Sequence, residues 1–241
     1  MLLRRWMLLL FGILGGILAA TGLYISAESI LTEEVLPTFA TEPTEVTQTK
    51  QQRPLPLGVP GTALIAQRLS AYDGPFLEDG SDREVVGIAA LLVYNGGSRE
   101  ILSAQITLEF ADVTYHFSGE NIPAGGMVVL LEQNAKAYRA DAPTGCTGCQ
   151  IISQAEPTLG EQIGIADGEM GVLSVTNLTD STLKNICIYY KSWLSPPDIY
   201  VGGISRCATL PQLLPGQTVY VYPCHYATGF SKVVSVTAAS D

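Results

Sequence analysis

The sequence has few of the side chains on which most enzymes depend. Its 241 residues include only two histidines, His116 and His225, which restricts the triads that could form. His225 directly follows Cys224, and adjacent residues of a strand face opposite sides, so this pair is not placed as base and nucleophile. No Walker-type glycine loop, DxDxDG loop or HExxH helix occurs, and we interpret the acidic run at 78–84, EDGSDRE, as a solvated turn rather than a calcium loop. We therefore predict no catalytic, cofactor-binding or metal-binding residues.

Basic residues are scarce as well. Thirteen lysines and arginines stand against 23 aspartates and glutamates, for a formal net charge of −10. Arg4 and Arg5 supply two of the positive charges at the N-terminus, so the rest of the chain carries −12. Phosphate recognition needs a clustered basic face. The charge pattern therefore argues against nucleic acid as a partner.

The sequence has one long apolar run, from Trp6 to Ile25, which contains 20 residues and no charge. A helix of that length rises about 30 Å, the thickness of the hydrocarbon core of a bilayer. Arg4 and Arg5 precede the run and Glu28 follows it, and positive charge stays on the cytoplasmic side. We predict that residues 1–27 form a single-pass anchor in the cell membrane through residues 6–25, with a cytoplasmic N-terminus and an extracytoplasmic bulk.

A cleaved signal peptide is the alternative interpretation of this segment. Ser26 and Ala27 could make a small-residue cleavage site. The apolar run is longer than the usual length of about 7–15 residues for a signal peptide, which favours the anchor. Under the alternative, the protein is secreted.

Residues 28–60 differ in character from the anchor. They are rich in Thr, Glu, Gln and Pro and show no sustained periodicity. Such a segment buries too little apolar surface to offset the entropy of ordering. We predict a disordered stalk that holds the following residues away from the membrane.

The remainder of the chain has the pattern of an all-β protein. Short runs of β-branched and aromatic residues alternate with clusters of Gly, Asn, Ser and Pro, and no window beyond the anchor carries a helical stripe. Turn signals at intervals of about 8–12 residues are typical of an antiparallel sandwich. The expected strands in the first half are Val86–Val93, Ile101–Phe110, Thr114–Phe117 and Met127–Leu131.

One stretch of the sequence recurs. LLVYNGGSREILSAQITLEF at 91–110 is echoed by LSVTNLTDSTLKNICIYYKS at 173–192. With an offset of 82 the apolar positions coincide and Asn95 meets Asn177. The offset later grows to 91, which places a nine-residue insertion in the hairpin around WLSPPDIY. This periodicity predicts two copies of one unit.

We place the two β-sandwich units at residues 61–145 and 155–238, joined by a linker at 146–154 that contains a CxxC motif. In each unit an apolar strand ends in Asn, and a short polar turn leads to a strand of the type ITLEF or ICIYY. A turn of the PG type then precedes a Val-rich strand. This order resembles the FxLYD-like and related immunoglobulin-like modules of bacterial envelope proteins, which are commonly tethered by one N-terminal helix. The resemblance implies two tandem immunoglobulin-like sandwiches, outside the cytoplasm and without enzymatic activity, and supplies no ligand.

The chain has no cysteine before Cys146, and the pair Cys146 and Cys149 stands in TGCTGCQ. Structural zinc usually needs two such pairs. A thioredoxin-like site needs a helix after the motif, whereas QIISQ follows here. We therefore expect a short loop closed by a disulfide between Cys146 and Cys149.

Strand parity sorts the other three cysteines. If Ile188 points into the second core, Cys187 points outward. Cys207 and Cys224 lie nearly symmetrically about the turn at 215–216, so a hairpin can bring them together. We predict a disulfide between Cys207 and Cys224 with Cys187 as the free thiol. A pairing of Cys187 with Cys207 is the alternative.

The combined observations predict a membrane-tethered surface or envelope protein that uses its sandwiches for protein or glycan contacts or as a spacer. One alternative is an accessory subunit of a membrane-bound envelope machine. A second is an extracytoplasmic hydrolase, or a redox protein that uses the CxxC motif, although no motif marks a catalytic site.

Overall fold

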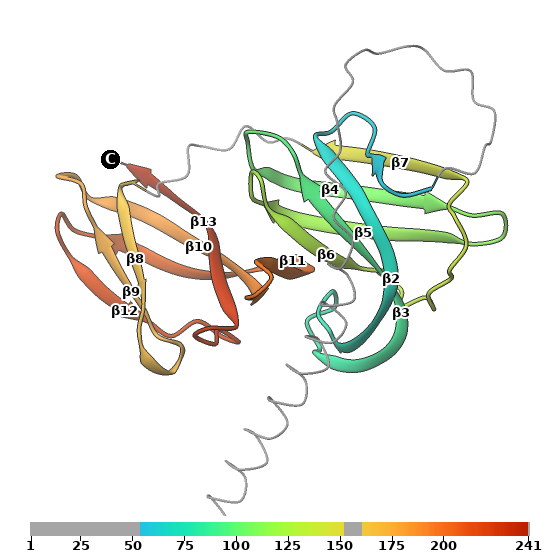
Figure 1. Cartoon of the computed structure of the whole chain (residues 1–241). Helices are drawn as coiled ribbons and strands as arrows, with labels where there is room; N and C mark the ends of the chain where they lie inside the picture. Colours follow the sequence, from blue (N-terminus) through green and yellow to red (C-terminus); the bar gives the residue numbers. More distant parts are fainter. Residues whose placement is uncertain (1–53, 152–160, 241) are drawn as a thin grey trace, which may run out of the picture.

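A computed structural model describes residues 54–151 and 161–240 of the chain (Figure 1). The predicted membrane segment at 6–25 and most of the predicted stalk lie outside these residues. Within the described part of the chain, no helix has the length and apolar character needed to cross a membrane.

The described residues confirm the all-β fold and form two groups of strands. The first group comprises β1 (Leu57–Gly58), β2 (Leu64–Phe76), β3 (Arg83–Asn95), β4 (Ile101–Glu109), β5 (Thr114–Ile122), β6 (Met127–Leu131) and β7 (Gly145–Ile151). The second group comprises β8 (Ile163–Asp167), β9 (Leu173–Asn177), β10 (Leu183–Leu194), β11 (Ile199–Leu213), β12 (Thr218–Val221) and β13 (Ser231–Ser240). A short 3-10 turn, η2 (Glu169–Gly171), precedes β9.

The same strand order occurs in both groups. In the first group β2, β3 and β6 are neighbours in one sheet, and β5, β4 and β7 are neighbours in another. In the second group β8, β9 and β12 follow the first of these orders, and β11, β10 and β13 follow the second. Strands that correspond in the sequence repeat therefore occupy corresponding places in the sheets.

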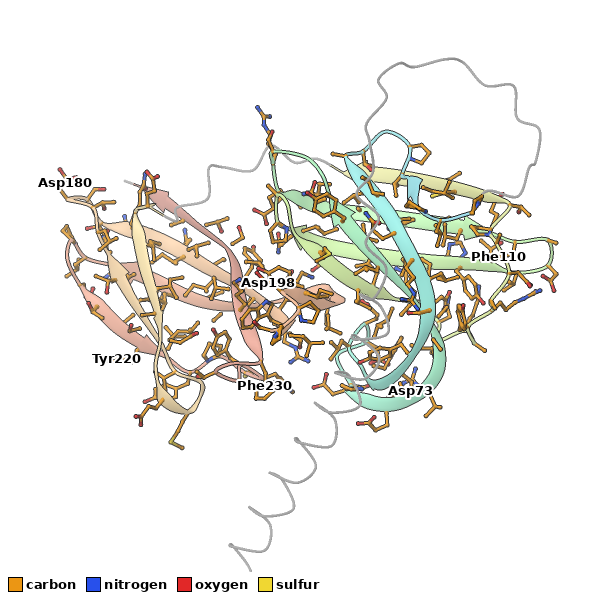
Figure 2. All side chains as sticks on the ribbon, viewed as in Figure 1. Asp73, Phe110, Asp180, Asp198, Tyr220 and Phe230 are labelled. Carbon is orange, nitrogen blue, oxygen red and sulfur yellow. The ribbon has the colours of Figure 1, made fainter. Side chains whose placement is uncertain are left out.

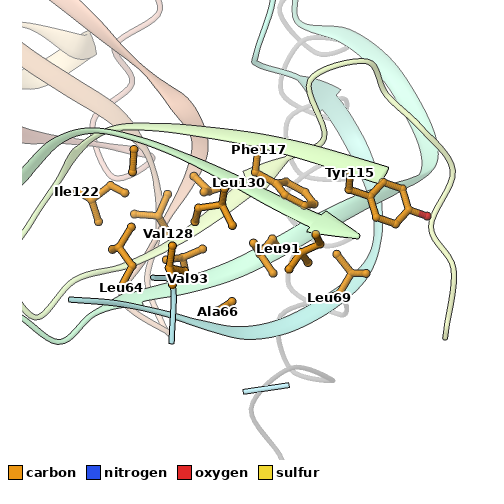
Figure 3. Close-up of a cluster of buried hydrophobic side chains, with 14 of the residues drawn as sticks. Leu64, Ala66, Leu69, Leu91, Val93, Tyr115, Phe117, Ile122, Val128 and Leu130 are labelled. Atoms are coloured by element: carbon orange, nitrogen blue, oxygen red, sulfur yellow. The ribbon is translucent and has the colours of Figure 1, made fainter. Parts of the chain in front are cut away.

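The alternation of side chains along β4 explains how the first group encloses its core. Ala104, Ile106 and Leu108 are buried, and the residues between them are more exposed, because successive strand residues point to opposite faces. The buried side chains pack with Leu91 and Val93 of β3, in the other sheet. Figure 3 shows the part of this core around Leu91 and Val93.

The second group encloses a core in the same way. Ile186, Ile188 and Tyr190 of β10 are buried, as strand parity predicted. They pack with Leu173 and Val175 of β9. Full burial of a large aliphatic side chain contributes about 1.5–3 kcal/mol, so each group has its own source of stability.

A buried asparagine closes the end of each core. The Asn95 side-chain amide donates to the carbonyl of Arg99 at 2.9 Å and to that of Ile122 at 3.1 Å. The Asn177 amide donates to the carbonyl of Ser181 at 2.8 Å and to that of Leu213 at 3.1 Å. These acceptors correspond to one another under the same offsets that align the repeat. Both asparagines are 0% exposed, and each satisfies one buried backbone carbonyl, that of Ile122 or that of Leu213.

Strand β11 belongs to both groups. One edge of β11 pairs antiparallel with β10 at both ends of the strand, and on its other edge the first residues, Ile199 to Val201, pair parallel with Met127 to Val129 of β6. One sheet of order β1-β2-β3-β6-β11-β10-β13 therefore runs through both groups (Figure 1). A third apolar cluster fills the region beside this contact and includes Phe76, Leu77 and Val201.

Two predicted boundaries differ from the structure. The predicted stalk extends to residue 60, but Leu57–Gly58 pairs with β2 and Val59 is 2% exposed. The predicted linker begins at residue 146, but its first part continues β7, which pairs with β4. In both places the unpaired backbone groups of a sheet edge are satisfied by a neighbouring segment, whatever its composition.

Candidate functional site

The hairpin of β10 and β11 carries the insertion that distinguishes the second group, and it forms the junction with the first. Under the two offsets, residues 191–205 of the second group correspond to residues 109–114 of the first, which contain the short connection between β4 and β5. Tyr190 pairs with Arg206 and Ser192 pairs with Val201, so residues 202–205 form a bulge opposite the single residue Lys191. A bulge of this kind turns backbone groups away from the ladder. Here it turns them toward Lys191.

Lys191 is a buried cation held by backbone carbonyls. Its side chain is only 2% exposed. The ammonium group donates to the carbonyls of Gly202 at 3.3 Å, Gly203 at 2.6 Å and Ile204 at 2.8 Å. An ammonium group has three donors, and these contacts use all of them. The charged Lys191 side chain can therefore be buried without an unsatisfied donor.

Burial lowers the pKa of Lys191 from its ordinary value to about 8. Three carboxylates act in the opposite direction, Glu78 most strongly, followed by Glu120 and Glu100. All three come from the first group of strands or the turns beside it. The second group therefore supplies the buried cation, and the first group supplies the charge that compensates it.

Glu78 connects the two groups through one carboxylate oxygen. The N–H of Gly203 donates to Glu78 Oε1 at 2.8 Å, and the N–H of Leu131 donates to the same atom at 3.1 Å. Burial raises the pKa of Glu78, although the two N–H donors and Lys191 reduce that effect. A single carboxylate thus ties β6 to β11 next to their parallel pairing.

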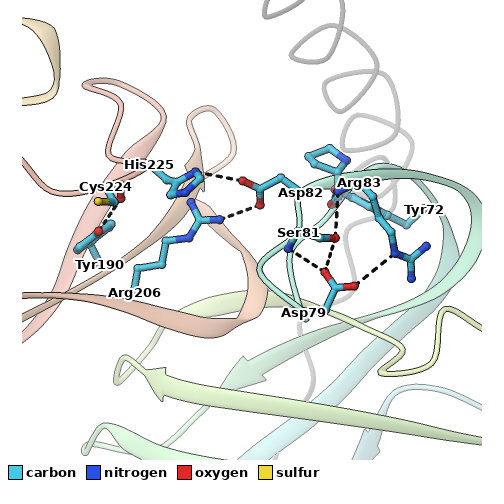
Figure 4. A network of polar contacts seen from close by, with 10 residues as sticks. Tyr72, Asp79, Ser81, Asp82, Arg83, Tyr190, Arg206, Cys224 and His225 are labelled. Atoms are coloured by element: carbon cyan, nitrogen blue, oxygen red, sulfur yellow. Dashed lines mark hydrogen bonds and ion pairs between the residues drawn. The ribbon is translucent and has the colours of Figure 1, made fainter.

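An ion pair, a carboxylate–histidine contact and a further hydrogen bond surround this contact. Asp82 accepts from Arg206 Nη2 at 2.7 Å and lies 3.1 Å from His225 Nδ1 (Figure 4). Glu120 Oε2 accepts from the N–H of Ser205 at 3.0 Å. Asp82 and Glu120 belong to the first group, whereas their partners belong to the second. In a chain with a net charge of −10, this complementarity favours one arrangement of the two groups.

The bulge needs its two glycines because its backbone lies very close to residues of the first group. A Cβ atom on Gly203 would lie 1.8 Å from the backbone oxygen of Ser118 in β5. Gly202 has a φ of +84°, and a Cβ there would lie 2.9 Å from Leu77. Only glycine lets the backbone of β11 reach the first group at this distance.

The hollow beside the junction is small. Leu77, Tyr190, Lys191, Val201 and Arg206 are among its lining residues, and it has room for about one water molecule. Lys191 cannot act as a nucleophile in this position, because its donors are engaged with carbonyl oxygens. In the described residues no group of three or more His, Cys, Asp or Glu side chains could hold a metal ion. The geometry of the junction suits the positioning of two structural units.

The predicted CxxC loop is not a loop in the structure. Cys146 pairs in register with Leu108, and Cys149 pairs with Gln105, along the extended strand β7. Three residues of extended strand span about 10 Å, which exceeds the Cα separation of about 7 Å that a disulfide tolerates. The predicted Cys146–Cys149 disulfide is therefore incompatible with this backbone. The Cys146 side chain packs against the first core, and burial raises its pKa.

The predicted disulfide between Cys207 and Cys224 is not present either. Both residues, like Cys187, are free thiols. Cys187 lies between the buried residues Ile186 and Ile188, and is half-exposed as parity predicted. The Cys207 thiol donates to the backbone carbonyl of Ala208 at 3.6 Å, and Cys187 lies close enough to contribute, after burial, to the raised pKa of Cys207. The structure therefore brings together the two cysteines of the alternative pairing.

Sequence reasoning missed the residues of the junction. The run EDGSDRE contains an exposed turn, in which Asp79 accepts from the N–H and hydroxyl of Ser81 (Figure 4). Glu78 and Asp82 of the same run contact the second group instead. The available signal was the insertion itself, which combines a lysine and a Gly-Gly pair with apolar residues.

Comparisons with known proteins leave the function to be argued from the structure. No known family model matches the sequence, and no curated protein sequence matches it significantly.

Proposed function

We propose that the protein is a membrane-tethered, extracytoplasmic envelope protein without enzymatic activity. Two immunoglobulin-like units, at 61–145 and 155–238, act as a spacer or carry contacts with a protein or glycan partner. The apolar segment at 6–25 and the charges before it support the tether. The repeated strand order supports the two units.

The observation that carries this proposal is the sharing of β11 between the two groups. Tandem domains joined only by a linker move relative to one another by default. Here the parallel pairing of β11 with β6 and the contacts of Glu78 and Lys191 oppose such motion. A body of this kind presents its far end at a constant distance and orientation, as a spacer or presenting module requires.

Exposed aromatic side chains on the second group support a role in contacts. Tyr220 and Tyr222 are 70% and 76% exposed, and Phe230 is 56% exposed (Figure 2). Tyr220 stands on β12, which is an edge of its sheet. Tyrosine combines a large apolar face with a polar hydroxyl, which suits protein and sugar surfaces alike.

The tether and its orientation are tested by adding protease to intact protoplasts that express the full chain. We expect loss of the residues after 28 and retention of a short N-terminal fragment in the membrane. Complete protection of the described strands would overturn the orientation. N-terminal sequencing of the mature protein separates the alternatives, since a chain that begins near Glu28 and is free of the membrane would show a cleaved signal.

The contact surface is tested by retention of the protein on purified envelope glycan and by site-specific crosslinking from position 220. Either a specific crosslink or retention that is lost on Tyr220→Ser and Tyr222→Ser supports contacts through this face. A matched control is Val86→Ser, since Val86 of the first group is 81% exposed. The absence of both signals leaves the spacer role.

A further inference from the structure

Strand register places two thiols on one face of the second group. Cys187 of β10 lies opposite Thr209, and Cys207 of β11 lies opposite Tyr189. Residues that face each other across antiparallel strands share a side of the sheet, and so do residues two apart along a strand. Cys187 and Cys207 are therefore diagonal neighbours on the side opposite the core. Cys207 is exposed and Cys187 is half-exposed, so reagents in solution can reach the pair.

Cys187 lies close enough to Cys207 to affect the pKa of its thiol. Burial, the nearby Cys187 and a hydrogen bond to it together raise the pKa of Cys207 to about 11. Burial, followed by the nearby Cys187 and Cys207, also raises the pKa of Tyr189. The Cys207 thiol, which donates to the carbonyl of Ala208 at 3.6 Å, consequently keeps its proton to a higher pH than an isolated cysteine does.

The pair lies at the base of the junction hairpin. Cys187 and Cys207 stand just outside the segment 191–205, which carries the bulge and pairs with β6. A disulfide between them would close a loop of the chain that contains the whole segment 191–205, including its contacts with the first group. The link would therefore restrain the hairpin at the point where it leaves the second core.

We propose that Cys187 and Cys207 are a reversible redox site, and that their disulfide staples the hairpin that joins the two groups of strands. The inference does not depend on the membrane tether, since it needs only a small-molecule disulfide as oxidant.

The chemistry is thiol–disulfide exchange in two steps. The Cys187 thiolate attacks one sulfur of the oxidant, which forms a mixed disulfide and releases the first small thiolate. Cys207 then loses its proton to solvent and attacks the Cys187 sulfur, which forms the protein disulfide and releases the second small thiolate. The protein loses two electrons and two protons, and the oxidant gains the two electrons as it becomes two thiols.

Diagonal placement also indicates that the bond is reversible. Diagonal neighbours lie about 7–8 Å apart in a flat sheet, near the upper limit for a disulfide, so closure needs a small movement of the two strands. Strained disulfides are more easily reduced than relaxed ones. This behaviour fits a site that responds to the redox conditions around the protein.

Peptide mapping tests the linkage. Purified full-length protein is treated with glutathione disulfide at pH 8, digested without reductant and analysed by mass spectrometry. We expect a Cys187–Cys207 linkage as the main product, lost in Cys187→Ser and Cys207→Ser and retained in the matched control Cys224→Ser. A Cys207–Cys224 linkage, or stable glutathione adducts on both cysteines, would overturn the proposal.

Hydrogen exchange tests the staple itself. Oxidation should raise the Tm by about 5 °C and slow amide exchange in residues 199–205 at least tenfold, with both effects reversed by dithiothreitol. The Cys207→Ser variant should show neither effect under the same treatment. A disulfide that forms without slowing exchange in this segment would show that the pair is not a staple of the junction.

Discussion

The two groups of strands share one order but differ in the connection that leaves their β4-type strand. In the first group the connection from β4 to β5 spans only residues 110–113, whereas the hairpin of β10 and β11 projects beyond its own core. The projecting part of β11 covers the edge of β6. In the second group β12, the counterpart of β6, remains at the edge of its sheet. One longer hairpin thus distinguishes two groups of the same strand order and gives them a defined contact.

The comparison also separates two kinds of stability. Each core depends on local strand pairs and on side chains that recur at the offset of the repeat. The junction depends on residues that have no counterpart in the other group, chiefly Lys191, Gly203 and Glu78. Changes in the cores should therefore act alike in both groups, whereas changes in the junction should act on their coupling.

The largest effect is expected from emptying corresponding core positions. Ile106 and Ile188 are 1% and 0% exposed, so Ile106→Ala and Ile188→Ala should each cost about 2–5 kcal/mol through lost burial and the remaining cavity. Urea unfolding followed by group-specific probes measures both. Gln105→Ala, at an exposed position of β4, is the control and should change little. A loss below about 1 kcal/mol at either position would contradict the assigned core.

The next effect concerns the junction alone. Gly203→Ala should cost about 3 kcal/mol, because the new Cβ would lie 1.8 Å from the backbone oxygen of Ser118. We expect the single unfolding transition of the wild type to split into two, one for each group. Gly58→Ala is the matched control, since nothing lies within 4 Å of a Cβ at that position. A wild-type chain that already unfolds in two separate steps would show that the junction does not couple the groups.

The pH dependence of the free energy of unfolding should reflect the lowered pKa of Lys191. Its pKa is about 8 in the folded protein, below the ordinary value of 10.5, so the unfolded chain binds more protons between these two values. The free energy of unfolding should therefore rise with pH from about 8 to 10.5, by at most about 3 kcal/mol. The difference between the wild type and Lys191→Met isolates this contribution from other groups that titrate at high pH.

At acid pH, Glu78 should make the free energy of unfolding change with pH in the opposite direction. Burial raises its pKa in the folded state above the ordinary value of 4.5, so the folded chain holds the proton more firmly. Its contribution to stability should fall as the pH rises from 4.5 through the folded pKa. Glu78→Gln should remove this slope, and an unchanged profile would contradict the burial of the carboxyl.

The smallest effect is expected from the two corresponding buried asparagines, and it tests whether they stabilise the two groups equally. Asn95→Ala and Asn177→Ala should each cost about 2 kcal/mol, because each leaves a buried backbone carbonyl without a donor. Asn134→Ala, at an exposed site in the first group, is the control. If Asn95→Ala lowered the free energy of unfolding and Asn177→Ala did not, the corresponding hydrogen bonds of the two asparagines would not be energetically equivalent.

Much of the all-β architecture was accessible from the sequence. Alternation of apolar residues predicted which side chains of β4 and β10 are buried, because period-2 patterning is a local property of a strand. The offset of the repeat predicted that Asn95 and Asn177 are equivalent, and their hydrogen bonds agree. The insertion around WLSPPDIY was also visible as a change of offset, although its role was not.

Tertiary structure alone decided the junction and the cysteine neighbours. Glu78 and Gly203 are 125 residues apart in the chain, and no local pattern encodes a contact over that distance. The alternation of strand residues placed Cys187 on the outer face. Only the register of β10 against β11 shows that the neighbour of Cys207 is Cys187, and not Cys224 as the sequence predicted. Composition assigned the segments before β2 and after residue 145 to a stalk and a linker, yet both pair with sheet edges. A sheet edge offers hydrogen bonds to any extended backbone, so membership of a sheet is decided by proximity in the folded chain.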